Sequence, residues 1–348
     1  MKKGIPIQAV IILIGGSLAY YRWVYLPGHP KVVEFAYILP DTAPLLDSRA
    51  EIHNVIATLK NGERIEVLSK DDDWAEVRAA EGEHGWVEAK SLMDSQVHEG
   101  GERLLKELND IPVQAQGHTT FEVNLRLEPS RDGAMLSRLN RNQKVEIFGR
   151  RLVARTTSGA ESGGEQPRAG GDEKASAGPA TQDAWYLVRI ESHAGWIYGR
   201  LVTLDIPDDI APYAESYNMV AWLVLNTVDE SGRKVPQYIA ADREDSQDYD
   251  FTHIRAFTWW AKEGHYATAF VESGLKGYFP IQVSHPDDNP EFRLRLVDAK
   301  GHKIQRVFKL YGTVVRPLGT VEGWTSDAMP AANERQPARR KSRASRRR

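Results

Sequence analysis

The sequence contains no cysteine. This absence excludes disulfides, thiolate metal sites, iron–sulfur clusters and a cysteine nucleophile, and it also excludes the lipidated cysteine of a bacterial lipoprotein. The signature motifs of serine hydrolases, P-loop nucleotide-binding proteins and zinc metalloproteases are missing as well. The ten histidines are scattered without metal-ligand spacing. We therefore predict a protein that is not an enzyme and that takes no cofactor and no metal.

Acidic residues are almost absent from the end of the chain. Residues 331–348 hold eight basic residues and one acidic residue, a balance of +7, so a net charge of −3 leaves −10 for the remainder. Such a block cannot bury enough apolar surface to fold, and we expect a disordered tail. The simplest interpretation is a solvated chain end, without a specific nucleic-acid partner. The alternative is contact with an anionic surface through Arg339, Arg340, Lys341, Arg343, Arg346, Arg347 and Arg348.

Only one run of the chain is long, apolar and uncharged. It extends from Gly4 to Tyr21, follows Lys2 and Lys3, and is closed by Arg22. At about 1.5 Å per residue it spans roughly 27 Å, close to the thickness of a bilayer core. We expect a transmembrane anchor with the body of the protein in the periplasm. A cleaved secretory signal and a buried core helix are the alternatives.

Two stretches of the chain repeat one another. Residues 60–68 (KNGERIEVL), 73–78 (DWAEVR) and 85–87 (GWV) recur in the same order as 140–148 (NRNQKVEIF), 184–189 (AWYLVR) and 195–197 (GWI). Alternating apolar and polar residues indicate half-buried strands, and the glycines mark turns. This order of short strands and Gly-Trp turns resembles the bacterial SH3-like domain.

The resemblance implies a small β-barrel that binds or scaffolds. Tandem domains of this kind, followed by a third region similar to residues 234–259 here, occur in bacterial envelope proteins. Many of those are lipoproteins, from which this chain departs by its missing cysteine and its arginine-rich tail. The resemblance carries over no established activity.

The third region contains about seven expected strands separated by Gly-containing charged turns. This pattern predicts an antiparallel sandwich or barrel, between which the sequence does not decide. The fold class is mainly β: two tandem SH3-like small β-barrels, then this antiparallel domain, with an N-terminal transmembrane or signal helix. The expected segments are an anchor or signal at 1–27, a first SH3-like domain at 28–94, a connector with a short helix at 95–117, a second SH3-like domain at 118–205 with a disordered insertion at 156–182, a C-terminal β domain at 206–320 and a disordered basic tail at 321–348.

Aromatic residues are the candidate ligand-binding groups. Trp74 and Trp185 occupy equivalent positions, opposite the apolar side of their strands, and as ligand-binding groups we expect both to be partly exposed. The alternative is that a long neighbouring loop covers both and that they complete the barrel core. Exposed indoles make good platforms for sugars and peptides. Trp86 and Trp196 follow glycine turns, where packing in the barrel is the commoner role. The candidate set is Trp74, Trp86, Trp185, Tyr186 and Trp196.

Two functional hypotheses follow. The first is an exported, non-catalytic scaffold that binds peptidoglycan peptides or an envelope protein. The second is a cell-wall hydrolase built on Asp242, Glu244 and Asp250 in the third region. These acids lie in a segment that is more typical of a polar loop before a strand, which favours binding over hydrolysis.

Overall fold

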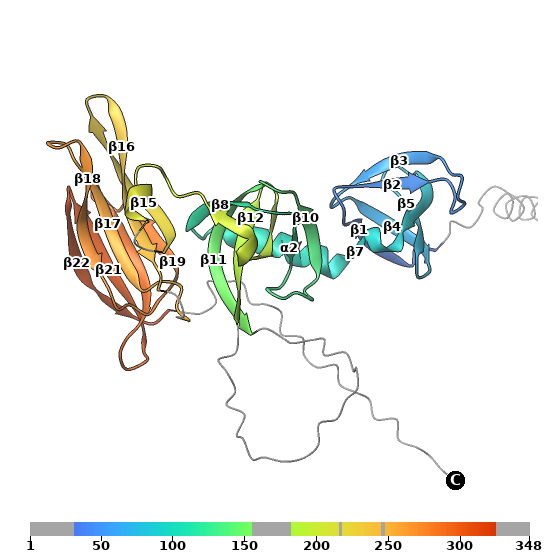
Figure 1. Ribbon diagram of the computed structural model, residues 1–348. Helices are drawn as coiled ribbons and strands as arrows, with labels where there is room; N and C mark the ends of the chain where they lie inside the picture. Colours follow the sequence, from blue (N-terminus) through green and yellow to red (C-terminus); the bar gives the residue numbers. More distant parts are fainter. Residues whose placement is uncertain (1–30, 155–181, 216–217, 245–247, 325–348) are drawn as a thin grey trace, which may run out of the picture. The chain divides into compact units, whose positions relative to one another are not determined.

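The computed structural model of the chain describes residues 31–154, 182–215, 218–244 and 248–324. The expected anchor at 1–27 and the basic residues from Arg339 to Arg348 lie outside this part, as does the expected insertion apart from Gln182. The chain divides into two compact units, Met1–Ser95 and Gln96–Arg348. Antiparallel strands dominate both units (Figure 1).

The first unit contains one antiparallel sheet in the order β3-β2-β6-β5-β4-β1-β7. Its inner face forms a core in which Ala75, Val77 and Val87 alternate with outward-facing residues. The strands are β1 (Glu34–Ile38), β2 (Thr42–Leu46), β3 (Val55–Lys60), β4 (Arg64–Lys70), β5 (Trp74–Arg78), β6 (His84–Glu88) and β7 (Leu92–Asp94).

A second seven-stranded sheet repeats this topology in the order β10-β9-β13-β12-β11-β8-β14. Each strand of the first sheet has a counterpart at the same place in the second. The strands are β8 (Ala115–Thr119), β9 (Val123–Arg126), β10 (Met135–Leu139), β11 (Lys144–Ala154), β12 (Gln182–Ile190), β13 (His193–Tyr198) and β14 (Val202–Leu204).

Local details recur between the two sheets. The Arg78 guanidinium lies 3.0 Å from Glu66, and Arg189 lies 2.8 Å from Glu146 at the equivalent position. In each sheet the strand that carries this glutamate also has a register shift, at Leu68 in β4 and at Phe148 in β11. The repetition seen in the sequence is therefore a repetition of the whole backbone arrangement.

One α-helix, α2 (Ser95–Leu108), precedes the second sheet and is longer than the short helix expected within the connector at 95–117. Gly100 and Gly101 are poor helix formers, so the sequence pattern does not predict the first half of this helix. A Cβ on Gly100 would lie 2.8 Å from the Leu127 side chain, and one on Gly101 would lie 2.9 Å from Leu136. Both glycines allow the helix to approach the second sheet closely. β8 begins at Ala115, so the expected connector over 95–117 ends inside a strand.

The third region is a sandwich of two four-stranded sheets, β15-β16-β17-β18 and β19-β20-β21-β22. One apolar core, with Ile239 and Ile254 from the first sheet and Phe292 and Phe308 from the second, lies between them. β22 was not expected from the sequence, and it extends two residues into the segment assigned to the tail. The strands are β15 (Met219–Glu230), β16 (Arg233–Asp242), β17 (His253–Trp260), β18 (His265–Glu272), β19 (Gly277–Ser284), β20 (Glu291–Val297), β21 (Lys303–Tyr311) and β22 (Val314–Glu322).

Candidate binding surfaces

Two tryptophans lie on the outer face of the first sheet. Trp74 pairs across the strands with Glu88, and Trp86 pairs with Glu76. Directly opposed residues on neighbouring strands point to the same side of a sheet. We call the surface formed by Trp74, Glu76, Trp86 and Glu88 the Trp74–Trp86 face. Both indoles are half-buried, so this face presents aromatic surface to solvent, as expected for Trp74.

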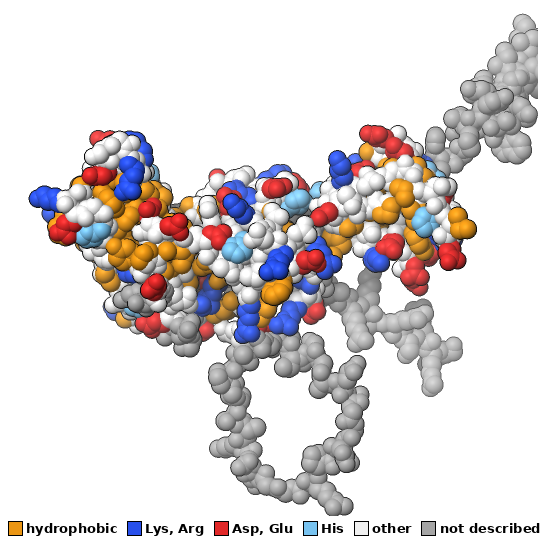
Figure 2. Space-filling model, turned by 45° about the horizontal axis from the view of Figure 1, so that its top comes forward, with side chains coloured by type: hydrophobic (Ala, Val, Ile, Leu, Met, Phe, Trp, Pro, Cys, Tyr) orange, Lys and Arg blue, Asp and Glu red, His pale blue; other side chains and the backbone are white. Residues whose placement is uncertain are grey.

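Charged groups surround these indoles. The Arg49 guanidinium lies 4.3 Å from the centroid of the Trp86 ring and 2.6 Å from the Asp71 carboxylate. The backbone N–H of Trp74 donates to Asp71 at 2.8 Å. This hydrogen bond is the largest influence that holds the pKa of Asp71 below its ordinary value, with the Arg49 charge as a smaller one. Glu76 lies 3.1 Å from His84. Figure 2 shows apolar, acidic and basic side chains interspersed over the first unit.

The equivalent face of the second sheet is closed. Trp185 is 3% exposed and Trp196 is fully buried. Both belong to a core cluster with Leu104 and Leu108, which α2 supplies. The expectation that Trp185 is partly exposed was therefore wrong, because a helix outside the repeat covers it. Neither indole is accessible to a ligand in this structure.

Substitutions between the two copies explain this difference. At the positions of Glu76 and Glu88 in the first sheet, the second has Leu187 and Tyr198. Both belong to or pack against the core cluster beneath α2. The signal was present in the sequence, since residues 184–188 (AWYLV) are apolar on both strand faces whereas 74–78 (WAEVR) alternate. A strand that is apolar on both faces indicates burial on both sides.

Tyr186 does not join the tryptophans. It is half-buried, and its neighbours in the sheet are Arg150 on β11 and Ile197 on β13. Since successive residues of a strand point to opposite sides, Tyr186 lies on the face away from Trp185. The structure thus separates the five predicted ligand-binding residues into an open pair in the first sheet, a covered pair in the second, and Tyr186 on the other side.

The second sheet is joined to the sandwich by Gln114, which is fully buried. Its side-chain amide donates to the carbonyl of Ile281 at 3.1 Å, and its side-chain oxygen accepts from the Ile281 N–H at 2.7 Å. Its backbone carbonyl accepts from the Trp222 N–H at 2.8 Å. One side chain thus satisfies backbone groups of β19 that would otherwise be buried without partners.

A buried ion pair adds to this junction. Arg150 on β11 donates to the Tyr249 carbonyl at 3.1 Å and lies 3.7 Å from the Asp250 carboxylate. Burial raises the pKa of Asp250 to about 6, although the Phe279 N–H and the Arg150 charge act in the opposite direction. Burial likewise lowers the pKa of Arg150. Desolvation therefore outweighs the attraction between these two groups.

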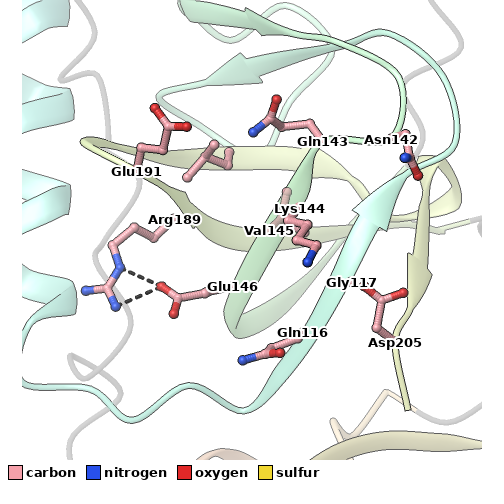
Figure 3. Close-up of a pocket in the computed structure, with 11 residues that line it drawn as sticks. Gln116, Gly117, Asn142, Gln143, Lys144, Val145, Glu146, Arg189, Glu191 and Asp205 are labelled. Atoms are coloured by element: carbon pink, nitrogen blue, oxygen red, sulfur yellow. Dashed lines mark hydrogen bonds and ion pairs between the residues drawn. The ribbon is translucent and has the colours of Figure 1, made fainter. Parts of the chain in front are cut away.

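A hollow of about 850 Å³ lies on the second sheet and is lined mostly by residues of β8, β11 and β12. Figure 3 shows how these side chains lie around it. The Arg189 guanidinium makes two contacts of 2.8 Å with the Glu146 carboxylate inside it. Asp205, also at its wall, lies 2.6 Å from His118. Two of its acidic side chains, Glu146 and Asp205, are thus held in ion pairs, and none of the predicted site residues lines it.

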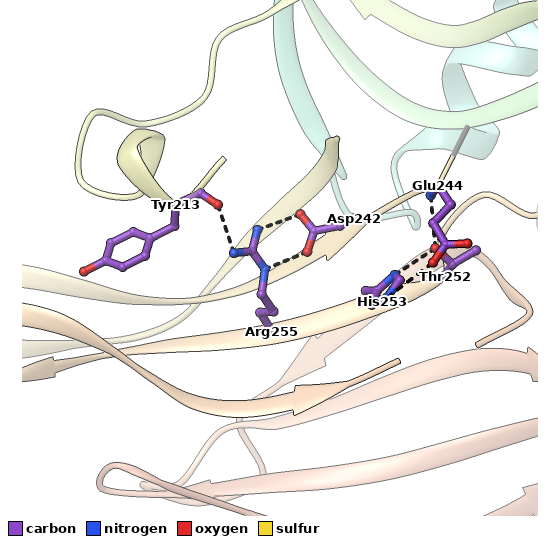
Figure 4. A network of polar contacts seen from close by, with 6 residues as sticks. All are labelled: Tyr213, Asp242, Glu244, Thr252, His253 and Arg255. Carbon is purple, nitrogen blue, oxygen red and sulfur yellow. Dashed lines mark hydrogen bonds and ion pairs between the residues drawn. The ribbon is translucent and has the colours of Figure 1, made fainter. Parts of the chain in front are cut away.

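The carboxylates of the alternative hydrolase site are held in separate contacts (Figure 4). The Arg255 guanidinium donates two hydrogen bonds of 2.7 Å to the Asp242 carboxylate, and Asp242 is 1% exposed. Glu244 lies 3.6 Å from His253 on the adjoining strand. Such bidentate contacts are typical of structural ion pairs. Arg255 thus holds a carboxylate of its own chain.

Over the residues that the structure describes, no helix is long and apolar enough to cross a membrane. Likewise, the described ranges contain no group of three or more histidine, aspartate or glutamate side chains placed to hold a metal ion.

Comparison with known proteins finds one family model that matches a segment of this chain. Residues 49–93 match the model of the bacterial SH3 domain, which confirms the resemblance for the first copy. A search of curated proteins finds no match.

Some solved structures are similar at low levels. An NlpC/P60 family protein from Bacillus cereus ATCC 10987 shares 13% identity, covering 85% of this chain and 96% of its own, with a TM-score of 0.21. NlpC2 from Trichomonas vaginalis shares 12% identity over 68% of this chain and 88% of its own, with a TM-score of 0.16. Such TM-scores support no argument about fold or activity.

Proposed function

We propose that this chain is a non-catalytic protein of the bacterial cell envelope, which binds cell-wall peptides or an envelope protein through the Trp74–Trp86 face. The match of residues 49–93 to the bacterial SH3 domain supports an envelope role. The observation that carries the proposal is the contrast between equivalent tryptophans. Trp74 and Trp86 remain accessible, whereas Trp185 and Trp196 are covered by the chain's own helix.

In this proposal both seven-stranded sheets are SH3-like barrels with different tasks. The first binds the ligand. The second is a structural brace, since α2 covers its aromatic face and Gln114 joins it to the sandwich. The N-terminal segment acts as a membrane anchor or as a cleaved export signal, and the intact mass of the mature protein distinguishes the two.

The runner-up function is wall hydrolysis by the carboxylates of the third region. Asp242 is held by Arg255, and Asp250 lies in the junction with the second sheet beside Arg150. These contacts favour a structural role for both acids. Loss of turbidity in a wall suspension on adding the protein would restore the hydrolase hypothesis.

Retention of the purified protein on isolated sacculi tests the binding proposal. The double variant Trp74→Ala/Trp86→Ala is compared with Trp260→Ala, which removes an indole that is 46% exposed on the sandwich. We expect at least tenfold weaker retention for the double variant, because both indoles on which the ligand packs are lost. Trp260→Ala should leave retention unchanged. A double variant that keeps its thermal unfolding midpoint and its retention contradicts the proposal.

For the arginine-rich tail, contact with an anionic surface is the alternative to a solvated chain end. If Arg339–Arg348 touch an anionic surface, deletion of residues 331–348 lowers retention on anionic vesicles at low ionic strength and has little effect at high ionic strength. Unchanged retention leaves the tail as a solvated chain end, which is the simpler interpretation.

A further inference from the structure

The first sheet already shows what kind of group its outer face accepts. Arg49 comes from the loop between β2 and β3, and its guanidinium lies over the Trp86 ring while contacting Asp71. An arginine over an indole combines cation–π attraction with planar stacking. The chain thus places one of its own arginines on the surface that we propose for a ligand.

Arg49 is held only at the surface. Its side chain is 47% exposed and that of Asp71 is 50% exposed. Exposed ion pairs contribute little to stability because water screens the charges and the long side chains lose freedom. An incoming group of the same chemistry can therefore displace Arg49 at small cost.

The second sheet shows the same chemistry in a fixed form. The Arg151 guanidinium lies 4.9 Å from the Trp196 ring, at the position equivalent to Trp86. Arg151 belongs to the strand β11, and Trp196 lies in the core cluster to which α2 contributes. The two copies thus share an arginine over the second tryptophan, but only in the first copy does it come from an exposed loop.

Acidic groups complete the first face. Glu76 and Glu88 lie beside Trp86 and Trp74 as cross-strand partners, where the second sheet has Leu187 and Tyr198. Their nearest cations are the His84 ring, charged only when protonated, and the Lys90 side chain, which is 80% exposed. Carboxylates beside accessible indoles complement a positive, planar group.

We infer that the Trp74–Trp86 face binds an arginine-bearing segment of a partner protein, which displaces Arg49 from Trp86. This inference rests on the proposed function and names the ligand chemistry of the same surface. The partner's guanidinium stacks on Trp86 and pairs with Asp71, and the neighbouring carboxylates of Glu76 and Glu88 attract further positive charge.

The test is a titration of the full chain, followed by calorimetry or NMR, with a capped peptide that carries two arginines separated by one glycine. The matched probe has citrulline, a neutral isostere, in place of arginine. We expect binding of the arginine peptide that weakens with salt, and at least tenfold weaker binding of the citrulline peptide. Equal binding of both peptides overturns the inference.

Variants then identify the site. Arg49→Ala removes the internal competitor and tightens binding by about fivefold. Trp86→Ala, and independently Glu76→Gln, weaken it. Arg64→Ala is the control, since its guanidinium also lies over an aromatic ring, 4.0 Å from the centroid of Phe35. Arg64 is on β4, which β5 separates from the strand β6 that carries Trp86. Binding that Arg49→Ala weakens or leaves unchanged overturns the displacement.

Two outcomes separate this inference from the proposed function. Sacculus retention that depends on Trp74 and Trp86, without preference for arginine over citrulline, overturns the inference and leaves the proposed function in place. Arginine-specific binding without sacculus retention supports the inference and excludes the cell-wall ligand. A third outcome concerns the chain's own tail. If deletion of residues 331–348 tightens binding as much as Arg49→Ala does, the tail is the occupant of the Trp74–Trp86 face, and the assignment to a partner is overturned.

Discussion

The two seven-stranded sheets have the same strand order, the same register shift and the same cross-strand ion pair, yet their outer faces differ in exposure. In the first sheet tryptophans alternate with carboxylates, and in the second the carboxylates are replaced by Leu187 and Tyr198. The second face therefore needs a cover, which α2 supplies. One backbone arrangement thus serves either as a free surface or as a buried one, and a few outward-facing residues decide which.

The largest expected effect comes from removing equivalent tryptophans. Trp185→Ala should destabilise the second unit by about 3–5 kcal/mol, because it opens a cavity under α2. Trp74→Ala should cost about 1 kcal/mol or less, because its indole is half-buried on an open face. Urea unfolding of the two variants measures this difference. Similar losses of stability for both would mean that the two faces are equally covered.

The second effect concerns pH. Since burial raises the pKa of Asp250 from 3.8 to about 6, the native state holds its proton more tightly than the unfolded state does. The stabilisation from this proton is complete below about pH 4 and is lost as the pH rises through about 6, at most about 3 kcal/mol. The Arg150–Asp250 contact has no counterpart among the ion pairs of the first sheet that the structure describes.

Comparison of the native chain with Asp250→Asn isolates this contribution. The free energy of unfolding of the second unit, measured by urea unfolding at several pH values, should fall between about pH 4 and 6 more steeply in the native chain than in the variant. Identical slopes would show that the pKa of Asp250 is not raised.

A smaller effect is expected at Gln114. Gln114→Ala leaves the Ile281 N–H and carbonyl without their partners and should cost about 2 kcal/mol. Val33 is the matched control: its N–H donates to the Val67 carbonyl as that of Gln114 does to Ile147, but its side chain is 68% exposed. Val33→Ala should change stability by less than about 0.5 kcal/mol. Equal effects in thermal unfolding would contradict the role of Gln114 as a junction.

Local patterns in the sequence predicted most strands but not their surroundings. About seven strands were expected in the third region, and β18 lies where alternation and the Gly-containing turn before it indicate one. β22 was missed, since Pro317 and Gly319 are poor strand residues and its side chains are largely exposed. Helix propensity also failed to predict the first half of α2, because two glycines lower the propensity there. In the structure, close packing on Leu127 and Leu136 outweighs the entropic cost of these glycines.

The candidate site was predictable only in part. Its tryptophans were identified from the repeat, but the burial of Trp185 depends on a helix that lies about eighty residues earlier in the chain and belongs to neither copy. The Arg150–Asp250 contact likewise joins residues of two different regions. Arg49, whose guanidinium lies 4.3 Å from the centroid of the Trp86 ring, comes from an irregular loop without any periodic signal. Such long-range contacts cannot be obtained from local periodicity.

The most direct test of the division between the two sheets is the solvent accessibility of their equivalent tryptophans in the intact chain. The full chain labelled with 5-fluorotryptophan gives one ¹⁹F resonance per indole, and single Trp→Phe variants assign them. A soluble gadolinium chelate then broadens the resonances of accessible rings first. We expect the resonances of Trp74 and Trp86 to broaden at much lower chelate concentration than those of Trp185 and Trp196. Broadening of all four at the same concentration would contradict it.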